Sequence, residues 1–148
     1  MYNYVEAALH AGHAILIYER LGTGKSNKPD GISKVQLATH IEIAAQLVRY
    51  LRIGKPGGSQ FNRVVEVGHS FGSVTLFGLV GKYGNVLDAM VLTGFAPLGG
   101  FAFSAFAAVG WTIASAGDPK RFGSLSSSYM ISEGVSNDQR SFFRYGNY

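Results

Sequence analysis

Apolar residues recur at helical spacing in the second quarter of the chain, and polar residues fill the positions between them. This pattern predicts an amphipathic helix from about Val35 to Ile53, with Ser33 as its cap, ended by the sequence GKPGGSQ. A shorter helix is expected over 4–12, closed by Gly12. The segment 71–84 is apolar on nearly every face, so it predicts a buried helix.

Three short apolar runs separate these helices and have the length and composition of β-strands. The predicted strands are Ala14–Glu19, Arg63–Gly68 and Asp88–Gly94. Because helices and strands alternate, we expect an α/β fold with three parallel strands and crossover helices. After Pro97 the sequence becomes rich in small and aromatic residues and then in Ser and Gly. Residues 1–97 are therefore interpreted as the core, and residues 98–148 as a different, cap-like helical segment with a polar tail.

An uncharged stretch runs from Ala89 to Gly117, and its second part is about as long as a membrane span. Pro97 and the many Gly, Ala and Ser residues argue against a span, and the first part reads as a buried strand. A buried or pocket-lining helix is therefore favoured over membrane insertion.

Composition narrows the class of protein only slightly. The chain has 148 residues, no cysteine and a net charge of +4, which suits one globular domain without disulfides or a thiolate metal site. Its Lys and Arg residues are scattered, and no basic stripe carries interleaved aromatics, so no nucleic-acid partner is expected. The first residues lack the pattern of a secretion signal, and the compartment stays open.

The segment from Leu16 to Ser26, LIYERLGTGKS, ends like a phosphate-binding loop. Such a loop needs a glycine five residues before its second glycine, and Glu19 occupies that position here. A carboxylate would repel a phosphate, and its Cβ would restrict the turn. The pattern therefore argues against a nucleotide site.

A G-x-S-x-G sequence stands where the second predicted strand meets the second long helix, and it consists of Gly68, His69, Ser70, Phe71 and Gly72. In a nucleophile elbow the serine lies on a strained strand-to-helix turn, and the flanking glycines allow close backbone approach. The Phe71 N–H would then face an oxyanion at the positive end of the helix. The alternative is an ordinary helix start with Ser70 as its cap.

These motifs together resemble the α/β-hydrolase family over Tyr4 to about Pro97. The loop Arg20–Ser26 matches that family's Arg-x-Gly-x-Gly-x-Ser turn. The sequences of this loop and of the elbow are similar to those of a group of uncharacterised fungal members. The resemblance implies a partial α/β-hydrolase fold and a serine hydrolase of esterase, lipase or peptidase type. Ser70 would be the nucleophile and Phe71 an oxyanion donor, acting through an acyl-enzyme with no cofactor or metal.

The chain departs from the family's triad order, which runs serine, acid, histidine. All of its histidines precede the predicted nucleophile: His10, His13, His40 and His69. The triad acid is not assigned, because Asp88 opens a strand at the wrong end of the sheet, and Asp118 and Asp138 lie in the cap-like part. The sequence therefore looks like an internal fragment that lacks the N-terminal strands and the acid and histidine region.

A missing strand would lie between Ala14–Glu19 and Arg63–Gly68 in the family's strand order. We expect either a gap at this place or direct pairing of the two strands, and the gap is the favoured interpretation. A strand inserted there by residues after Gly94 would contradict both.

Aromatic residues crowd the cap-like part, at Phe101, Phe103, Phe106 and Trp111. As the underside of a cap they would favour a lipophilic ester- or amide-type carbonyl substrate, and as core residues they would imply nothing about a ligand. The alternative to an enzyme is a truncated, non-catalytic hydrolase-like protein that binds an apolar ligand.

Overall fold

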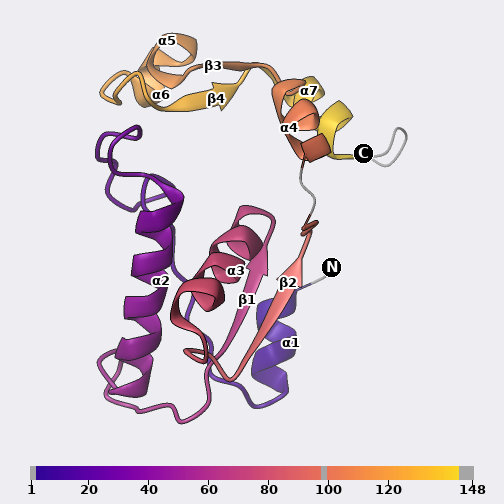
Figure 1. Cartoon of the computed structure of the whole chain (residues 1–148). Coiled ribbons are helices and arrows are strands. Elements are labelled where there is room, and N and C mark those ends of the chain that lie inside the picture. Colours follow the sequence, from indigo (N-terminus) through magenta and orange to yellow (C-terminus); the bar gives the residue numbers. More distant parts are fainter. Residues whose placement is uncertain (1–2, 98–99, 144–148) are drawn as a thin grey trace.

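The computed structural model describes residues 3–97 and 100–143, which form a mixed α/β structure, 41% helical and 12% strand. Figure 1 shows the order of the helices and strands along the chain, which alternate from α2 to α5. The elements are α1 (Tyr4–His10), α2 (Leu37–Arg52), β1 (Val65–His69), α3 (Phe71–Tyr83), β2 (Ala89–Thr93), α4 (Gly100–Ala107), β3 (Trp111–Ile113), α5 (Ala114–Gly117), α6 (Pro119–Phe122), β4 (Met130–Ser132) and α7 (Val135–Phe142).

Strands β1 and β2 form the predicted parallel pair, with α3 as the crossover helix between them. Val65 pairs with Ala89 at one end of the register and His69 with Thr93 at the other. The carboxyl ends of both strands therefore meet at one edge, where α3 begins. The alternation of helix and strand is confirmed for this unit.

The first predicted strand, Ala14–Glu19, is not a strand in the structure. A strand requires ladder hydrogen bonds to a neighbour, and in the described residues β1 pairs only with β2. The sheet thus has two parallel strands instead of three, and direct pairing of Ala14–Glu19 with β1 is not observed. Ile17 remains 68% exposed, as an apolar residue without a covering layer would be.

The helix α2 begins two residues later than its predicted start at Val35, because the expected cap does not form. Ser33 donates through both its N–H and its hydroxyl to the Asp30 carboxylate, at 2.8 and 2.7 Å. Its side chain thus closes a turn ahead of the helix. Gln36 takes the N-cap position without a side-chain cap bond.

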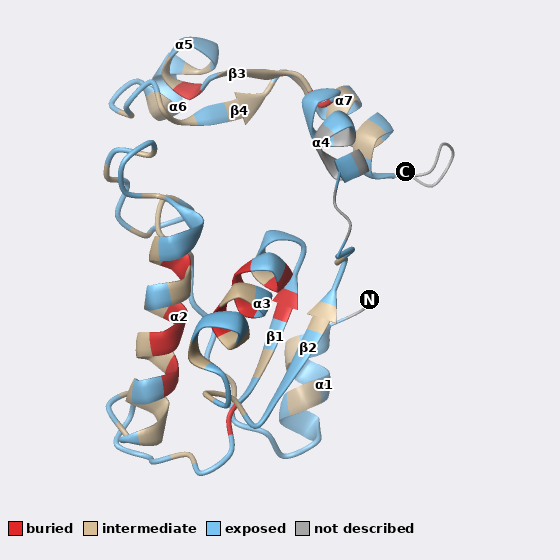
Figure 2. Ribbon diagram, viewed as in Figure 1, coloured by how far each residue is buried: buried red, intermediate tan, exposed pale blue. Residues whose placement is uncertain are grey.

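The core lies between α2, α3 and one face of the parallel pair (Figure 2). Its fully buried members are Ala44, Ala45, Leu76 and Leu79, and Leu92 of β2 packs against them. The small residues let the two helices approach closely, since a Cβ on Gly78 would lie 2.6 Å from the Ile41 side chain. The prediction of a buried helix is right for one face of α3 only, because Phe71, Val74 and Phe77 on the other face are 39%, 38% and 56% exposed.

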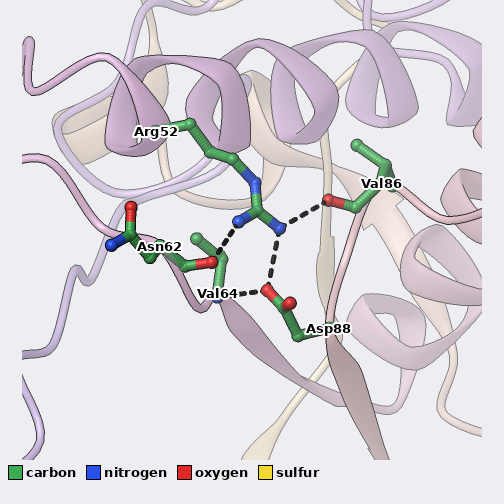
Figure 3. Close-up of polar contacts among 5 residues, drawn as sticks. All are labelled: Arg52, Asn62, Val64, Val86 and Asp88. Carbon is green, nitrogen blue, oxygen red and sulfur yellow. Dashed lines mark hydrogen bonds and ion pairs between the residues drawn. The ribbon is translucent and has the colours of Figure 1, made fainter.

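A polar clamp ties the carboxyl end of α2 to the start of both strands (Figure 3). The Arg52 guanidinium donates to the Asn62 and Val86 carbonyls and to the Asp88 carboxylate, at 2.7, 3.3 and 2.8 Å. Asp88 also accepts the Val64 N–H at 2.7 Å. The clamp holds the end of the sheet opposite the elbow.

Residues 100–143 contain a small antiparallel pair, β3 and β4, together with short helices. The segment expected to be helical therefore also contains two short strands in its described part. Two hydrogen bonds join it to the loop ahead of α2: Ser128 Oγ accepts the Gly31 N–H at 2.9 Å, and Tyr129 donates to the Pro29 carbonyl at 2.6 Å. No helix in the described residues is long and apolar enough to span a membrane.

The chain exposes far more surface than its mass requires. Its accessible area is 10641 Å², whereas a compact protein of 15.9 kDa exposes about 7,400 Å². Part of the excess lies on the sheet face turned away from α3, where Val65, Val67 and Val91 are 55%, 41% and 41% exposed. Parallel sheets are usually covered on both faces, so this face is unusually bare.

Candidate active site

Ser70 occupies the turn between β1 and α3, as the G-x-S-x-G pattern predicts. Its φ of 52° and ψ of −118° make it the one residue other than glycine with positive φ in the described part of the chain. Such a backbone conformation is strained for a side chain with a Cβ, and strain of this kind gathers at functional turns. Ser70 is exposed, so its hydroxyl is accessible.

The two flanking glycines differ in what they allow. A Cβ on Gly68 would lie 2.7 Å from the backbone of Gly72 and Ser73, so the close approach of strand and helix requires glycine there. A Cβ on Gly72 would meet nothing within 4 Å. The close backbone approach expected at both glycines is therefore seen at Gly68, whereas Gly72 has room for a Cβ.

The start of α3 offers free hydrogen-bond donors beside the serine. Among the described residues, the N–H groups of Phe71 and Gly72 have no acceptor, whereas the Ser73 and Val74 N–H groups bond to the Ser70 carbonyl. Unpartnered N–H groups at the positive end of a helix stabilise negative charge. The predicted oxyanion role of Phe71 is chemically possible in this geometry.

Thr93, at the end of β2, fixes the turn from the neighbouring strand. Its carbonyl accepts from the Ser70 N–H at 2.9 Å and from the buried Ser73 hydroxyl at 2.8 Å. Its own hydroxyl donates to the Gly68 carbonyl and lies 3.0 Å from Nδ1 of His69. His69, the variable residue of the elbow, is thus held by Thr93.

The glycine-rich loop after Ala14–Glu19 is filled by its own carboxylate. The Glu19 side chain accepts the Lys25 N–H at 2.5 Å and packs against Gly24, and its carbonyl accepts the Ser26 hydroxyl at 2.7 Å. These contacts occupy the place where a phosphate loop would receive its ligand. The geometry agrees with the sequence argument against a nucleotide site.

Arg20 brings this loop onto the elbow, a contact that the sequence analysis did not foresee. Its guanidinium lies 4.9 Å from the centre of the Phe71 ring, and His40 meets the same ring edge-on at 5.6 Å. His40 is buried, and burial, followed by the positive charge of Arg20, lowers the pKa of its imidazole. Both effects favour the neutral imidazole.

A cavity of about 280 Å³ opens beside this cluster. It is lined by the loop around Arg20 to Thr23, by residues ahead of α2 and His40 within it, by Phe71, and by Ser128 to Met130 of the C-terminal part. Ser70 itself is not among the lining residues. The cavity thus adjoins the elbow through Phe71, next to the predicted nucleophile.

Within residues 3–97 and 100–143, no acid and no histidine forms a hydrogen bond with the Ser70 side chain. Each predicted acid candidate has a structural contact: Asp88 in the clamp, Asp118 accepting the Arg121 N–H at 3.1 Å, and Asp138 accepting the Ser132 hydroxyl at 2.8 Å. His10 and His13 are exposed around the end of α1.

Two of the four aromatic residues predicted for the cap surface have described side chains, and these two contact each other. Phe106 stacks on Trp111 with ring centres 4.9 Å apart, and the Trp111 indole donates to the Phe106 carbonyl at 2.7 Å. Neither lines the cavity. The side chains of Phe101 and Phe103 lie outside what the structure describes.

No family model matches the chain, and no curated protein matches it.

Proposed function

We propose that this chain carries the nucleophile half of an α/β-hydrolase-type serine hydrolase acting on an ester- or amide-type carbonyl. The observation that carries the proposal is the conformation of Ser70, an exposed serine with φ of 52° between a parallel strand and a helix. A helix cap does not need this conformation, since cap residues ordinarily adopt extended backbone. The resemblance of the Arg20–Ser26 loop to the family's turn supports the same assignment.

In the proposed reaction the Ser70 oxygen bonds to the carbonyl carbon, and the carbonyl π electrons move to its oxygen. The Phe71 N–H stabilises this oxyanion at the start of α3. Collapse re-forms the carbonyl and expels the alcohol or amine, leaving an acyl-enzyme that water hydrolyses. The serine proton must pass to a base and then to the leaving group.

The same site also supports the alternative of a non-catalytic, hydrolase-like protein. In the described residues the candidate acids are committed to structural contacts, and His69 is held by Thr93. Without a base, the attack of a neutral serine is slow. We therefore expect ester turnover by this chain alone to be barely above buffer and unchanged in Ser70→Ala.

A fluorescent active-serine phosphonate tests whether Ser70 is nevertheless activated. Wild-type chain, Ser70→Ala and the matched control Ser59→Ala, which removes an exposed loop serine, are labelled in parallel and resolved by mass spectrometry. An activated Ser70 is labelled in wild type and in Ser59→Ala but not in Ser70→Ala, and absence of label from wild-type Ser70 would contradict the enzyme assignment. Equal labelling of all three proteins would contradict the enzyme assignment.

A further inference from the structure

We propose that the cavity beside the elbow binds the carboxylate of a small organic anion, with Arg20 as its charged ligand. The identity of this anion as the acyl part of a substrate rests on the proposed function, whereas the binding itself does not. The substrate would then be an ester that carries a free carboxylate, held away from the carbonyl that Ser70 attacks.

The cavity wall carries a positive charge, that of Arg20. Arg20 is half-buried in its wall, and no carboxylate lines the cavity. Among the described residues no acid pairs with the Arg20 guanidinium, and the neighbouring Glu19 carboxylate is turned into the loop against Lys25 and Gly24. The cavity therefore holds one positive charge without a counter-charge, which attracts an anion.

The contact with Phe71 leaves Arg20 free to bind. The guanidinium lies 4.9 Å from the centre of the ring, and a contact with the ring face uses no N–H hydrogen bond to an acceptor atom. The N–H groups of Arg20 can therefore still match a carboxylate in a bidentate pair.

The hydroxyl groups of the wall are already engaged. The Thr23 hydroxyl donates to the Arg20 carbonyl, the Ser128 hydroxyl accepts the Gly31 N–H, and the Tyr129 hydroxyl donates to Pro29. Arg20 is thus the charged donor of the wall, with the His40 imidazole beside it, which suits a single anionic group. Phe71 supplies an apolar wall, and the volume of about 280 Å³ lies just below the roughly 300–1,000 Å³ typical of small-molecule sites, so the bound anion must be small.

The test uses the full chain and two probes that differ in one charge, monomethyl glutarate and dimethyl glutarate. Titration followed by amide NMR shifts should show the monoester binding about tenfold or more tightly than the diester, with shifts at Thr23 and Gly31. Arg20→Gln should abolish this preference. The control Arg49→Gln, which removes a cation 5.5 Å from the Tyr83 ring on another surface, should keep it.

Equal binding of the two esters to the wild-type chain overturns the inference, and this comparison does not depend on whether Arg20→Gln folds. Preserved discrimination in a folded Arg20→Gln protein overturns the role of Arg20. Failure of the two proposals is distinguishable. A monoester preference without phosphonate labelling of Ser70 contradicts only the proposed hydrolase, and labelling without the preference contradicts only the anion site.

Discussion

Residues 3–97 and residues 100–143 are stabilised in different ways. The first region has a connected apolar core between α2, α3 and the parallel strands, closed at one end by the Arg52–Asp88 clamp. In the second region only Val109 and Ala114 are buried among the described side chains, and short-range hydrogen bonds dominate. Regions with few buried apolar contacts open at lower free energy, so we expect the second region to unfold locally before the first.

The largest expected effect comes from emptying the core of the first region. Leu76 is fully buried, so Leu76→Ala should lower the free energy of unfolding by about 2–5 kcal/mol, measured by urea denaturation with circular dichroism. Val109→Ala, the matched truncation in the second region, should leave that transition unchanged and speed proteolysis within residues 100–143. A similar loss of global stability in both variants would show that the two regions unfold as one unit.

A smaller loss of stability is expected when the Arg52–Asp88 clamp is weakened. The Val64 N–H, followed by the Arg52 guanidinium, lowers the pKa of Asp88. The folded protein therefore gains stability from the ionised carboxylate above its unfolded-state pKa, and loses it as pH falls through the lowered folded-state value.

Asp88→Asn should accordingly lower the melting temperature at pH 7 and make no difference at strongly acidic pH, in melts followed across the pH range. Asp118→Asn, which weakens the N-cap of α6, serves as the control in the second region and should leave the core transition in place. An unchanged acid dependence in Asp88→Asn would show that the clamp does not contribute to stability.

The smallest expected effect is a stabilisation. Burial raises the pKa of the Glu66 carboxyl in β1, and its Oε2 is buried without a hydrogen-bond partner in the described residues. Because the folded state disfavours the carboxylate, stability declines as pH rises from the unfolded-state pKa through the raised folded-state value. Removing the charge should therefore help at neutral pH.

Glu66→Gln should raise the free energy of unfolding at pH 7 by about 1 kcal/mol, or about 2–4 °C in melting temperature, with no gain at pH 4. Glu133→Gln, an exposed acid of the second region, should be neutral. A destabilised Glu66→Gln protein would mean that the carboxylate has a partner in solution.

The parts of the fold that sequence predicted well are those determined locally. The unit from β1 through α3 to β2 has strands of buried composition, a helix ended by Gly84, and an elbow whose residues are adjacent in sequence. Ala14–Glu19 has an equally apolar composition, yet it forms no strand, because a ladder depends on a partner elsewhere in the chain. Strands β3 and β4 were missed because three residues each are too few to show a period.

The candidate site divides in the same way. Ser70 and Gly68 were predictable from a local motif, whereas the meeting of Arg20, His40 and Phe71 joins three segments distant in sequence. The arginine at the start of the glycine-rich loop was a usable signal, because the family that this loop resembles has such a turn at the carboxyl edge of its sheet. No pattern in the sequence indicated that Thr93 would hold the turn at Ser70.

The closeness in sequence of β1 and β2 also bears on how the chain acquires its structure. Residues paired in this sheet, such as Val65 and Ala89, are joined through a single helix. Closing this 24-residue loop loses less entropy than closing the 100-residue loop that joins Tyr129 to Pro29, so we expect the strand pair to form first. During synthesis the strained serine turn can therefore be completed while residues 100–143 are still being added, and before the surface around Tyr129 has closed the neighbouring cavity.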